Sequence, residues 1–173
     1  VNVEVIIDHF KTKNKLVSLE QLHKVCEEDP KMRFSMKSIT YEEDGDQFYM
    51  RANNGHSIEK VREERLMDPI IKEEIPAAIH ATTMEAWKFI FDEGLSPMTR
   101  RCIQMACGPP SDPSVKSGVR KTSPIHIWID VGEAMKAGIK FFRTENGVIC
   151  SPDNIPSKFF SRVQNVVTGD VIV

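Results

Sequence analysis

The chain has 173 residues, of which 40% are hydrophobic and 28% charged, and a formal net charge of -2. This length allows one large or two small domains, each with its own core. The near-neutral charge excludes a uniformly basic protein, so any contact with nucleic acid must come from a local cluster of Arg and Lys. Neither an apolar run of about 18 residues nor a secretion leader is present, so we expect no membrane span and a cytoplasmic or nuclear protein.

The cysteines, Cys26, Cys102, Cys107 and Cys150, show no CxxC spacing. No zinc-type histidine pattern accompanies them, which argues against both a metal site and a disulfide framework. We therefore expect reduced thiols and no bound metal.

The first part of the chain predicts two helices. Apolar residues recur at helical spacing over Val3–Phe10, and a polar run then ends the pattern. Ser18 with Gln21 three residues later is typical of a capping box, which predicts a second helix that ends before Pro30.

A hairpin is predicted next. Two runs rich in strand-forming residues, 33–38 and 47–52, are joined by the acidic turn 42–46. Two helices followed by a hairpin indicate a small winged-helix module.

The stretch 63–77 mixes charges with two prolines and has no clear period, so we predict a linker. A domain boundary is expected near Asp68, which gives domains 1–67 and 68–173.

The second half predicts a mixed α+β lobe, and the fold class of the chain is therefore α+β. A helix capped by Thr82 or Thr83 is expected to end at Gly94. The other expected elements are strands 102–106 and 125–130, a short helix 133–137, and a hairpin around Asn146-Gly147. The side chains assigned to the core are Trp87, Met98, Met105, Phe141 and Phe142.

The segment Arg51–Ser57 places a guanidinium, two amides, an imidazole and a hydroxyl around one glycine, which suits an anion. Its candidate ligands are Arg51, Asn53, Asn54, Gly55, His56 and Ser57. The same letters also fit an Asn-Gly hairpin turn with Ser57 as a cap, and this alternative stays open.

His80-Ala81-Thr82 lies where a strand is expected to meet a helix, and a histidine there can hold a ribose or a phosphate. It can equally be a satisfied core histidine. Ser117-Gly118-Val119-Arg120 places a second arginine before the clearest strand, where Arg51 and Arg120 can converge on one phosphate. The alternative is two solvated surface arginines.

In chain order, these segments resemble the RNA 2′-phosphotransferases, which are NAD-dependent enzymes that remove a 2′-phosphate from spliced tRNA. Arg51–Ser57 is similar to the family's R-A-N-Q-G-H-S, His80–Thr82 to its H-G-T, and Ser117–Arg120 to its S-G-M-R. Gly94, Leu95, Met98 and Arg100 follow its G-L-x-x-M-x-R segment. Residues 138–142, 146–148 and 155–160 complete the pattern.

The resemblance implies a winged-helix lobe, an ADP-ribosyltransferase-like lobe and an active site in the cleft between them. It also implies two steps. The RNA 2′-phosphate attacks the anomeric carbon of the nicotinamide ribose and expels nicotinamide. The ribose 2″-hydroxyl then attacks phosphorus, which releases RNA with a 2′-hydroxyl and ADP-ribose 1″,2″-cyclic phosphate.

By the same resemblance, Arg51 and Arg120 are catalytic, and residues 53–57 bind the substrate phosphate. The NAD side is assigned to His80, Ala81, Thr82, Gly94, Leu95 and Arg100. The expected partners are tRNA, or another RNA with a 2′-phosphate, and NAD, with the protein a monomer.

Three departures from the family pattern bear on activity. The family carries an Arg-His pair in an L-R-H helix, and no such pair is found in this sequence. Either the first lobe is N-terminally incomplete here and the pair lies upstream of Val1, or the chain lacks half of its catalytic residues. The family's H-[VI]-H is replaced by Cys102-Ile103-Gln104, and Ala81 stands where the family has glycine, which we expect to crowd the nucleotide. These departures motivate two alternatives: a member without turnover that only binds RNA ends or nucleotide, or a winged-helix nucleic-acid-binding module with an appended domain.

Overall fold

The computed structural model describes residues 1–55, 66–71, 77–109, 111–113, 115, 117–118 and 122–173. The chain divides into two compact units, Val1–Asn54 and Gly55–Val173, and each is described by itself. The expected domain boundary near Asp68 stays a prediction. In the described ranges, no helix combines the length and apolarity that a membrane crossing requires.

The first unit begins with the two predicted helices, α1 (Val3–Thr12) and α2 (Leu19–Glu28). Ser18 accepts a hydrogen bond from the backbone N–H of Gln21, and the Gln21 side chain accepts one from the backbone N–H of Ser18. The predicted capping box is therefore confirmed, and it satisfies two N–H groups that a helix start leaves unpaired.

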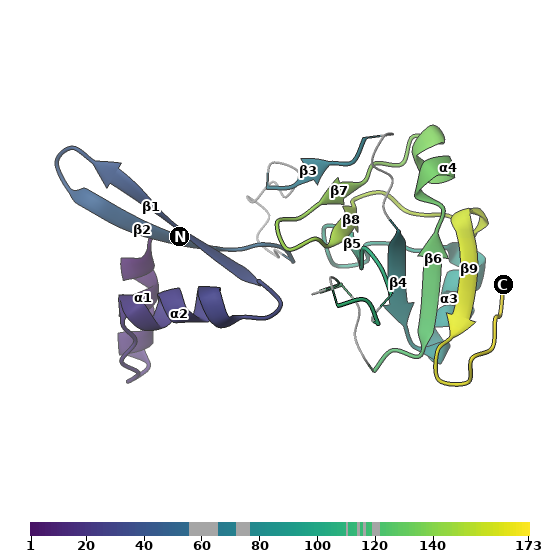
Figure 1. Ribbon diagram of the computed structural model, residues 1–173, viewed down its shortest axis with the longest axis horizontal. Coiled ribbons are helices and arrows are strands. Elements are labelled where there is room, and N and C mark those ends of the chain that lie inside the picture. The colour runs from purple at the N-terminus through teal and green to yellow at the C-terminus, as the bar shows by residue number, and fades with distance from the viewer. Residues whose placement is uncertain (56–65, 72–76, 110, 114, 116, 119–121) are drawn as a thin grey trace. The chain divides into compact units, whose positions relative to one another are not determined.

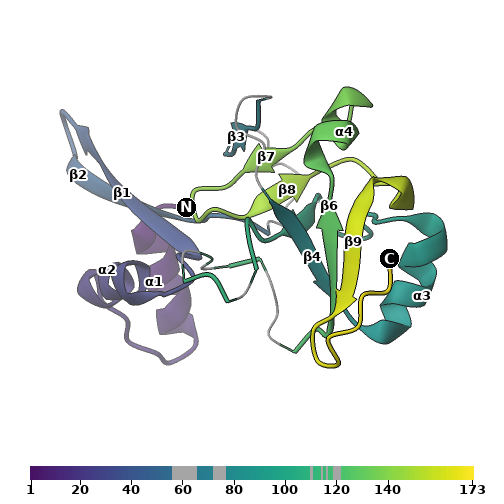
Figure 2. The ribbon, with the colours of Figure 1, turned by 45° about the vertical axis from the view of Figure 1, so that its right-hand side comes forward.

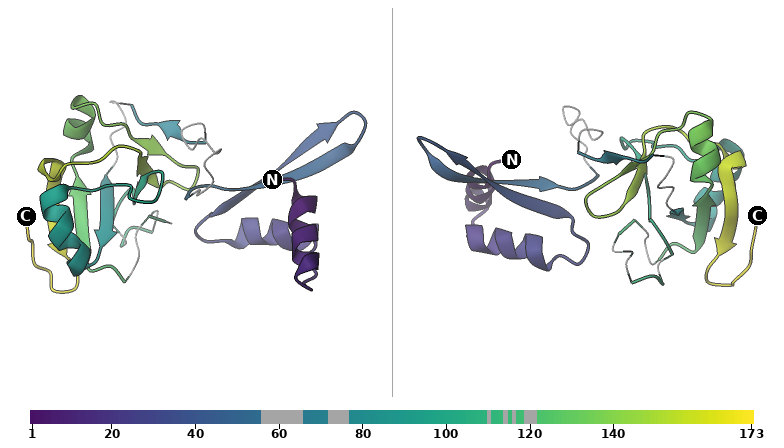
Figure 3. Two further views of the ribbon diagram at one scale, coloured as in Figure 1. Left: turned by 180° about the vertical axis from the view of Figure 1, so that it is seen from behind. Right: turned by 45° about the horizontal axis from the view of Figure 1, so that its top comes forward.

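The predicted hairpin is also confirmed, with longer strands than expected. β1 (Phe34–Tyr41) and β2 (Gly45–Ala52) pair antiparallel in a regular register from Phe34 opposite Ala52 to Tyr41 opposite Gly45. The turn is short because Gly45 adopts a φ of 69°, which other residues rarely do. Both helices lie on the same side of the hairpin (Figure 1, Figure 3), where Val3, Leu22 and Met50 form the core of this unit.

The second unit is built on short antiparallel strands. Their bounds are β3 (Asp68–Pro69), β4 (Ala78–Thr82), β5 (Ile103–Met105), β6 (Ile125–Ile129), β7 (Phe142–Arg143), β8 (Ile149–Ser151) and β9 (Phe160–Asn165). One sheet has the order β3-β7-β8-β5 and the other β4-β6-β9. Figure 2 shows the second sheet with its three strands side by side.

In the described part of the second unit, these sheets are accompanied by α3 (Met84–Glu93), α4 (Val131–Lys136) and the 3₁₀ turn η3 (Ser157–Phe159). Thr83 caps α3 by accepting from the N–H of Ala86, and Gly94 ends it at a φ of 80°, as predicted. α3 lies against the sheet β4-β6-β9 (Figure 3) and contributes the buried Trp87 to the core. The buried members of this core include Ile103, Met105, Ile125, Ile127, Ile149, Ile155 and Val163.

Three sequence-based predictions need correction. The stretch predicted as a linker contains β3, which pairs with β7, and Ile70 directly after it is buried in the core. Pro69 is tolerated there because β3 is an edge strand. Met98, assigned to the core, is 85% exposed with a φ of 54°. β9 was not predicted, because its polar residues mask one buried side chain, Val163.

Candidate functional site

Backbone hydrogen bonds join the two sheets of the second unit between β4 and the end of β5. The backbone N–H of Ile79 donates to the carbonyl of Ala106, and the N–H of Ala106 donates back to Ile79, both at 2.9 Å. This pair is an isolated bridge and no ladder continues from it. In an antiparallel ladder the next such pair would join Ala81 to Gln104.

At that next position, the imidazole of His80 takes the place of the backbone hydrogen bond to Gln104. Its Nδ1 lies 3.0 Å from the carbonyl oxygen of Gln104. Because a carbonyl oxygen can only accept, Nδ1 carries the proton and Nε2 is left with a lone pair. The ring thus satisfies a carbonyl that the ladder would otherwise pair, and β4 and β5 part at this residue.

His80 is kept neutral. Burial lowers its pKa below the ordinary value, the hydrogen bond to Gln104 opposes that shift, and the charge of Arg100 adds to it. A neutral ring with a free Nε2 lone pair accepts a hydrogen bond from a hydroxyl and offers no positive charge to a phosphate. Of the two ligands that the sequence left open, the geometry favours the ribose hydroxyl.

The residues that follow His80 divide between the two faces of β4. His80 lies opposite Ile127, Ala81 opposite His126 and Thr82 opposite Ile125. Since side chains alternate along a strand, His80 and Thr82 share one face and Ala81 points to the other. The methyl group of Ala81 therefore points away from the ring of His80, and the crowding of the nucleotide by Ala81 stays a prediction.

Gly118 packs against the same bridge. It adopts a φ of 103°, and a Cβ built on it would lie 2.7 Å from both the backbone N and the Cα of Ala106. No side chain fits there without moving main chain. The S-G-x-R motif thus packs against the end of β5 through Gly118. Arg120 lies outside the described residues.

Gly55 brings a third motif to β5. Its φ is 72°, and a Cβ on it would lie 3.4 Å from Nε2 of Gln104. Three motifs that are far apart in the sequence therefore contribute Gly55, His80 and Gly118 to the surroundings of Ile103–Ala106. His56 and Ser57 lie outside the part of the chain that the structure describes.

The replaced H-[VI]-H segment is β5 itself. Cys102 is 4% exposed and packs with Val148 and Cys150 in a small apolar cluster, so this position contributes packing. Gln104 pairs with Cys150 across β5 and β8 and directs its amide toward Gly55. Of the two histidines that the family pattern would place here, one position is thus buried and the other faces Gly55.

The segment that follows α3 has a structural explanation. Gly94 closes the helix, and a Cβ on it would lie 2.5 Å from the carbonyl oxygen of Ile155. Leu95 is buried and exchanges two backbone hydrogen bonds with Ile155. Arg100 differs from both, because it is exposed and its charge acts on His80. Only Arg100 among these three offers a side chain to a ligand.

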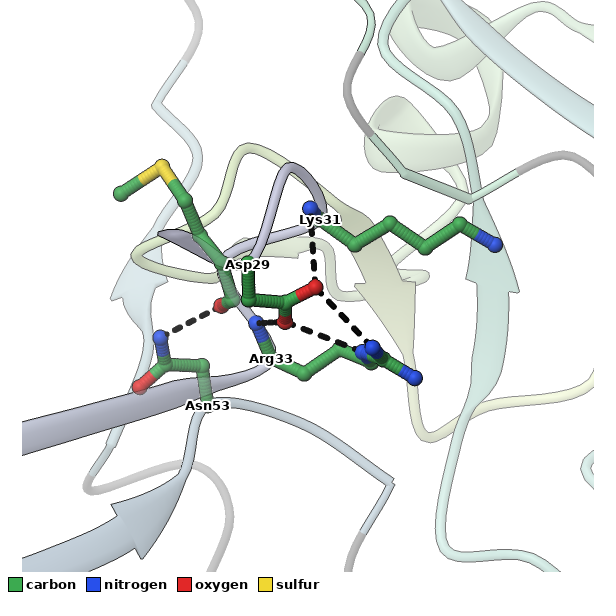
Figure 4. A network of polar contacts seen from close by, with 5 residues as sticks. Asp29, Lys31, Arg33 and Asn53 are labelled. Atoms are coloured by element: carbon green, nitrogen blue, oxygen red, sulfur yellow. Dashed lines mark hydrogen bonds and ion pairs between the residues drawn. The ribbon is translucent and has the colours of Figure 1, made fainter. Parts of the chain in front are cut away.

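In the first unit, Asn53 is turned inward. It is 3% exposed, and its Nδ2 donates to the carbonyl of Met32 at 2.7 Å (Figure 4). Its Oδ1 accepts from the hydroxyl of Ser35 at 2.6 Å. Its backbone N–H donates to the carbonyl of Arg33. The amide therefore fixes the loop between α2 and β1, whereas Arg51, two residues earlier, is exposed on β2.

The same loop carries an ion pair that the sequence reading missed. Asp29 accepts from Nε and from a terminal nitrogen of Arg33, both at 3.0 Å, and from the backbone N–H of Arg33 at 2.7 Å (Figure 4). These contacts lower the pKa of Asp29 to about 2. The signal was present in the sequence, since an aspartate at a helix end stands four residues before an arginine.

Comparison with known proteins identifies the class. A family model described as "RNA 2'-phosphotransferase, Tpt1 / KptA family" matches residues 1–153, and the chain belongs to this family.

Several curated relatives are similar to this chain in sequence. A putative tRNA 2′-phosphotransferase of Schizosaccharomyces pombe is 38% identical over 164 residues, which cover 91% of this chain but 42% of that protein. The tRNA 2′-phosphotransferase 1 of Danio rerio is 34% identical over 96% of this chain and 74% of its own length. The tRNA 2′-phosphotransferase of Saccharomyces cerevisiae is 28% identical over 96% and 71%. The chain thus spans less than half of the fission yeast relative.

Proposed function

We propose that this chain takes part in removing a splice-junction 2′-phosphate from tRNA by transferring it to NAD, with RNA 2′-hydroxyl, nicotinamide and ADP-ribose 1″,2″-cyclic phosphate as products. The first unit is then a winged-helix lobe and the second an ADP-ribosyltransferase-like lobe. The convergence of Gly55, His80 and Gly118 on β5 carries this proposal, because it gathers parts of three family motifs around one strand. The family assignment supplies the reaction class.

The polar groups around β4 fit a dinucleotide. Nε2 of neutral His80 accepts from a ribose hydroxyl, and Thr82 presents its side chain on the same face of the strand. Arg100 supplies an exposed cation for a pyrophosphate. When bound, NAD supplies the ribose carbon to which the phosphate is transferred.

The phosphate is assigned to the arginines and to the turn at Gly55. With a positive φ and no Cβ, Gly55 lets an anion approach the main chain. Arg51 offsets the charge of the bound 2′-phosphate. Arg120 has a similar role when the ribose hydroxyl attacks phosphorus and charge builds on the phosphate oxygens. Asn53 holds the end of β2, on which Arg51 stands, to the loop after α2.

The test is to incubate the full-length protein with NAD and an RNA that carries one internal 2′-phosphate, and to measure nicotinamide and 2′-hydroxyl RNA. We expect both in equal amounts, and none with the same RNA that lacks the 2′-phosphate. Absence of both products would sink the enzyme proposal. If RNA or nucleotide still bound under those conditions, the chain would be the binding protein that Cys102 and Gln104 suggest.

A further inference from the structure

The β1–β2 hairpin has two unlike faces. Met36, Phe48 and Met50 lie on the inner face, where they pack with α1 and α2. The residues that alternate with them lie on the outer face. These are Ser35, Lys37, Ile39 and Tyr41 on β1, and Gln47, Tyr49 and Arg51 on β2. Both helices lie on the inner side, so neither covers this outer face (Figure 1, Figure 3).

The tyrosines of the outer face are held in place. The hydroxyls of Tyr41 and Tyr49 lie 3.2 Å apart, and the Tyr49 hydroxyl donates to Oε1 of Gln47 at 3.1 Å. Nδ2 of Asn2 donates to the same Gln47 oxygen. Tyr41 still exposes 41% of its surface. Ring orientation is thus fixed before any ligand binds, which lowers the entropy that binding would cost.

Positive charge is interleaved with these rings. Lys37 is exposed and lies directly opposite Tyr49, and Arg51 is exposed and lies opposite Ser35. None of the seven outer-face residues is acidic, whereas Glu42, Glu43 and Asp44 occupy the hairpin turn. The outer face is therefore positive toward Arg51 and ends at a negative tip. Oriented aromatic rings with interleaved cations are the groups that bind single-stranded nucleic acid, through stacked bases and backbone phosphates.

We propose that the outer face of the β1–β2 hairpin binds the single-stranded RNA next to the 2′-phosphate, with Lys37 on a backbone phosphate and Tyr41 and Tyr49 under bases. This inference rests on the proposed function for its RNA ligand. The bound RNA runs along this face toward Arg51, because Arg51 lies on the face and begins the segment that reaches Gly55 four residues later. From Arg51 to the turn the face extends over six residues of strand, about 20 Å, and the acidic turn limits it there.

The test measures binding of a short, fluorescently labelled single-stranded RNA with one internal 2′-phosphate by anisotropy. We expect Lys37→Ala and Tyr41→Leu each to raise the Kd by roughly 5- to 10-fold. Lys37→Ala should also reduce the slope of log Kd against log salt by about 0.7. Tyr41→Phe keeps the ring but loses the hydroxyl contact that orients it, so its Kd should lie between those of the wild type and Tyr41→Leu. In turnover, the loss should appear in KM for RNA.

Matched controls lie elsewhere on the chain. Lys13→Ala removes the same charge from an exposed loop after α1, and Phe89→Leu makes a similar aromatic change at a side chain 67% exposed on α3. Both should bind as the wild type does. Unchanged binding by Lys37→Ala and Tyr41→Leu, or an equal loss in both controls, would overturn the proposal. Because binding is measured without NAD, it is read separately from any failure of the wild type to release nicotinamide.

Discussion

Asn53 and Gly55 stand two residues apart in one family motif, yet the structure uses them differently. Asn53 is buried, and its amide forms hydrogen bonds with Met32 and Ser35 within the first unit. Gly55 is exposed, begins the second unit and lies against the side chain of Gln104. One short segment thus combines a buried residue that fixes the fold with an exposed glycine at positive φ, and a shared motif by itself does not tell the two apart.

The contrast is sharpest between Arg51 and Asn53. We expect Arg51→Ala to lower turnover of 2′-phosphorylated RNA by about 100- to 1,000-fold, because a positioned charge on the reacting phosphate is lost. Its effect on the free energy of unfolding should stay below about 1 kcal/mol, as for other exposed substitutions.

Asn53→Ala should show the opposite pattern. It removes the hydrogen bonds to the Met32 carbonyl and from the Ser35 hydroxyl, so we expect a loss of about 2 to 3 kcal/mol in unfolding free energy, measured by urea denaturation. Once folded, the variant should retain more activity than Arg51→Ala. A stable but inactive Asn53→Ala would instead place its amide on the substrate.

Gly118→Ala tests the packing of the third motif on β5. The new methyl group would lie 2.7 Å from the backbone of Ala106. We expect about 3 kcal/mol of destabilisation, from strain plus displaced main chain, together with lost activity. Gly138→Ala is the matched control, because Gly138 has a φ of 93° and no atom within 4 Å of a Cβ. It should cost only about 1 kcal/mol. Equal losses would remove close approach as the reason for glycine at 118.

His80→Asn separates the two nitrogens of the imidazole. The asparagine amide can still donate to the carbonyl of Gln104, but nothing replaces the Nε2 acceptor. We expect KM for NAD to rise about 10-fold, the loss of one hydrogen bond to a ligand. His126→Asn is the control, since His126 lies on the opposite face of the sheet. If both variants raised KM equally, the hydroxyl contact of His80 would be excluded.

The smallest effect is on the pH dependence of stability. Burial lowers the pKa of both His80 and His126 below 6.5, so the unfolded chain takes up protons more readily. Their contribution is fully present above the unfolded value and is lost as the pH falls through the folded one. We expect unfolding free energy to fall as the pH drops below 6.5, and to fall less in His80→Asn. A steeper fall in that variant would contradict the neutral ring.

Local sequence rules predicted most of the elements. The capping box at Ser18, the Thr83 cap and the turn at Asn146-Gly147 each depend on neighbours in the sequence, and all three lie where expected. β3 could not be predicted, because it is a strand only by virtue of pairing with β7, more than 70 residues later. Such pairings are set by tertiary contacts.

The site divides in the same way. The sequence predicted which motifs carry chemistry, since Gly55, His80 and Gly118 each stand in a recognisable pattern, and that role stays a prediction. It did not show that His80 would take the place of a ladder hydrogen bond at Gln104, because the partner lies 24 residues away on another strand. Nor did it show that Asn53 faces inward, since inward and outward amides look alike in a sequence.

The proposed NAD site at the β4–β5 junction is tested most directly by mapping NAD binding by NMR on the isotope-labelled protein. We expect the amide signals of Gly55, of 79–82, of 103–106 and of 117–118 to shift together as NAD is added. The signals of the Asn53 network, residues 29–35, should stay in place. Shifts confined to the first unit, or spread over the second without the β4–β5 junction, would contradict it.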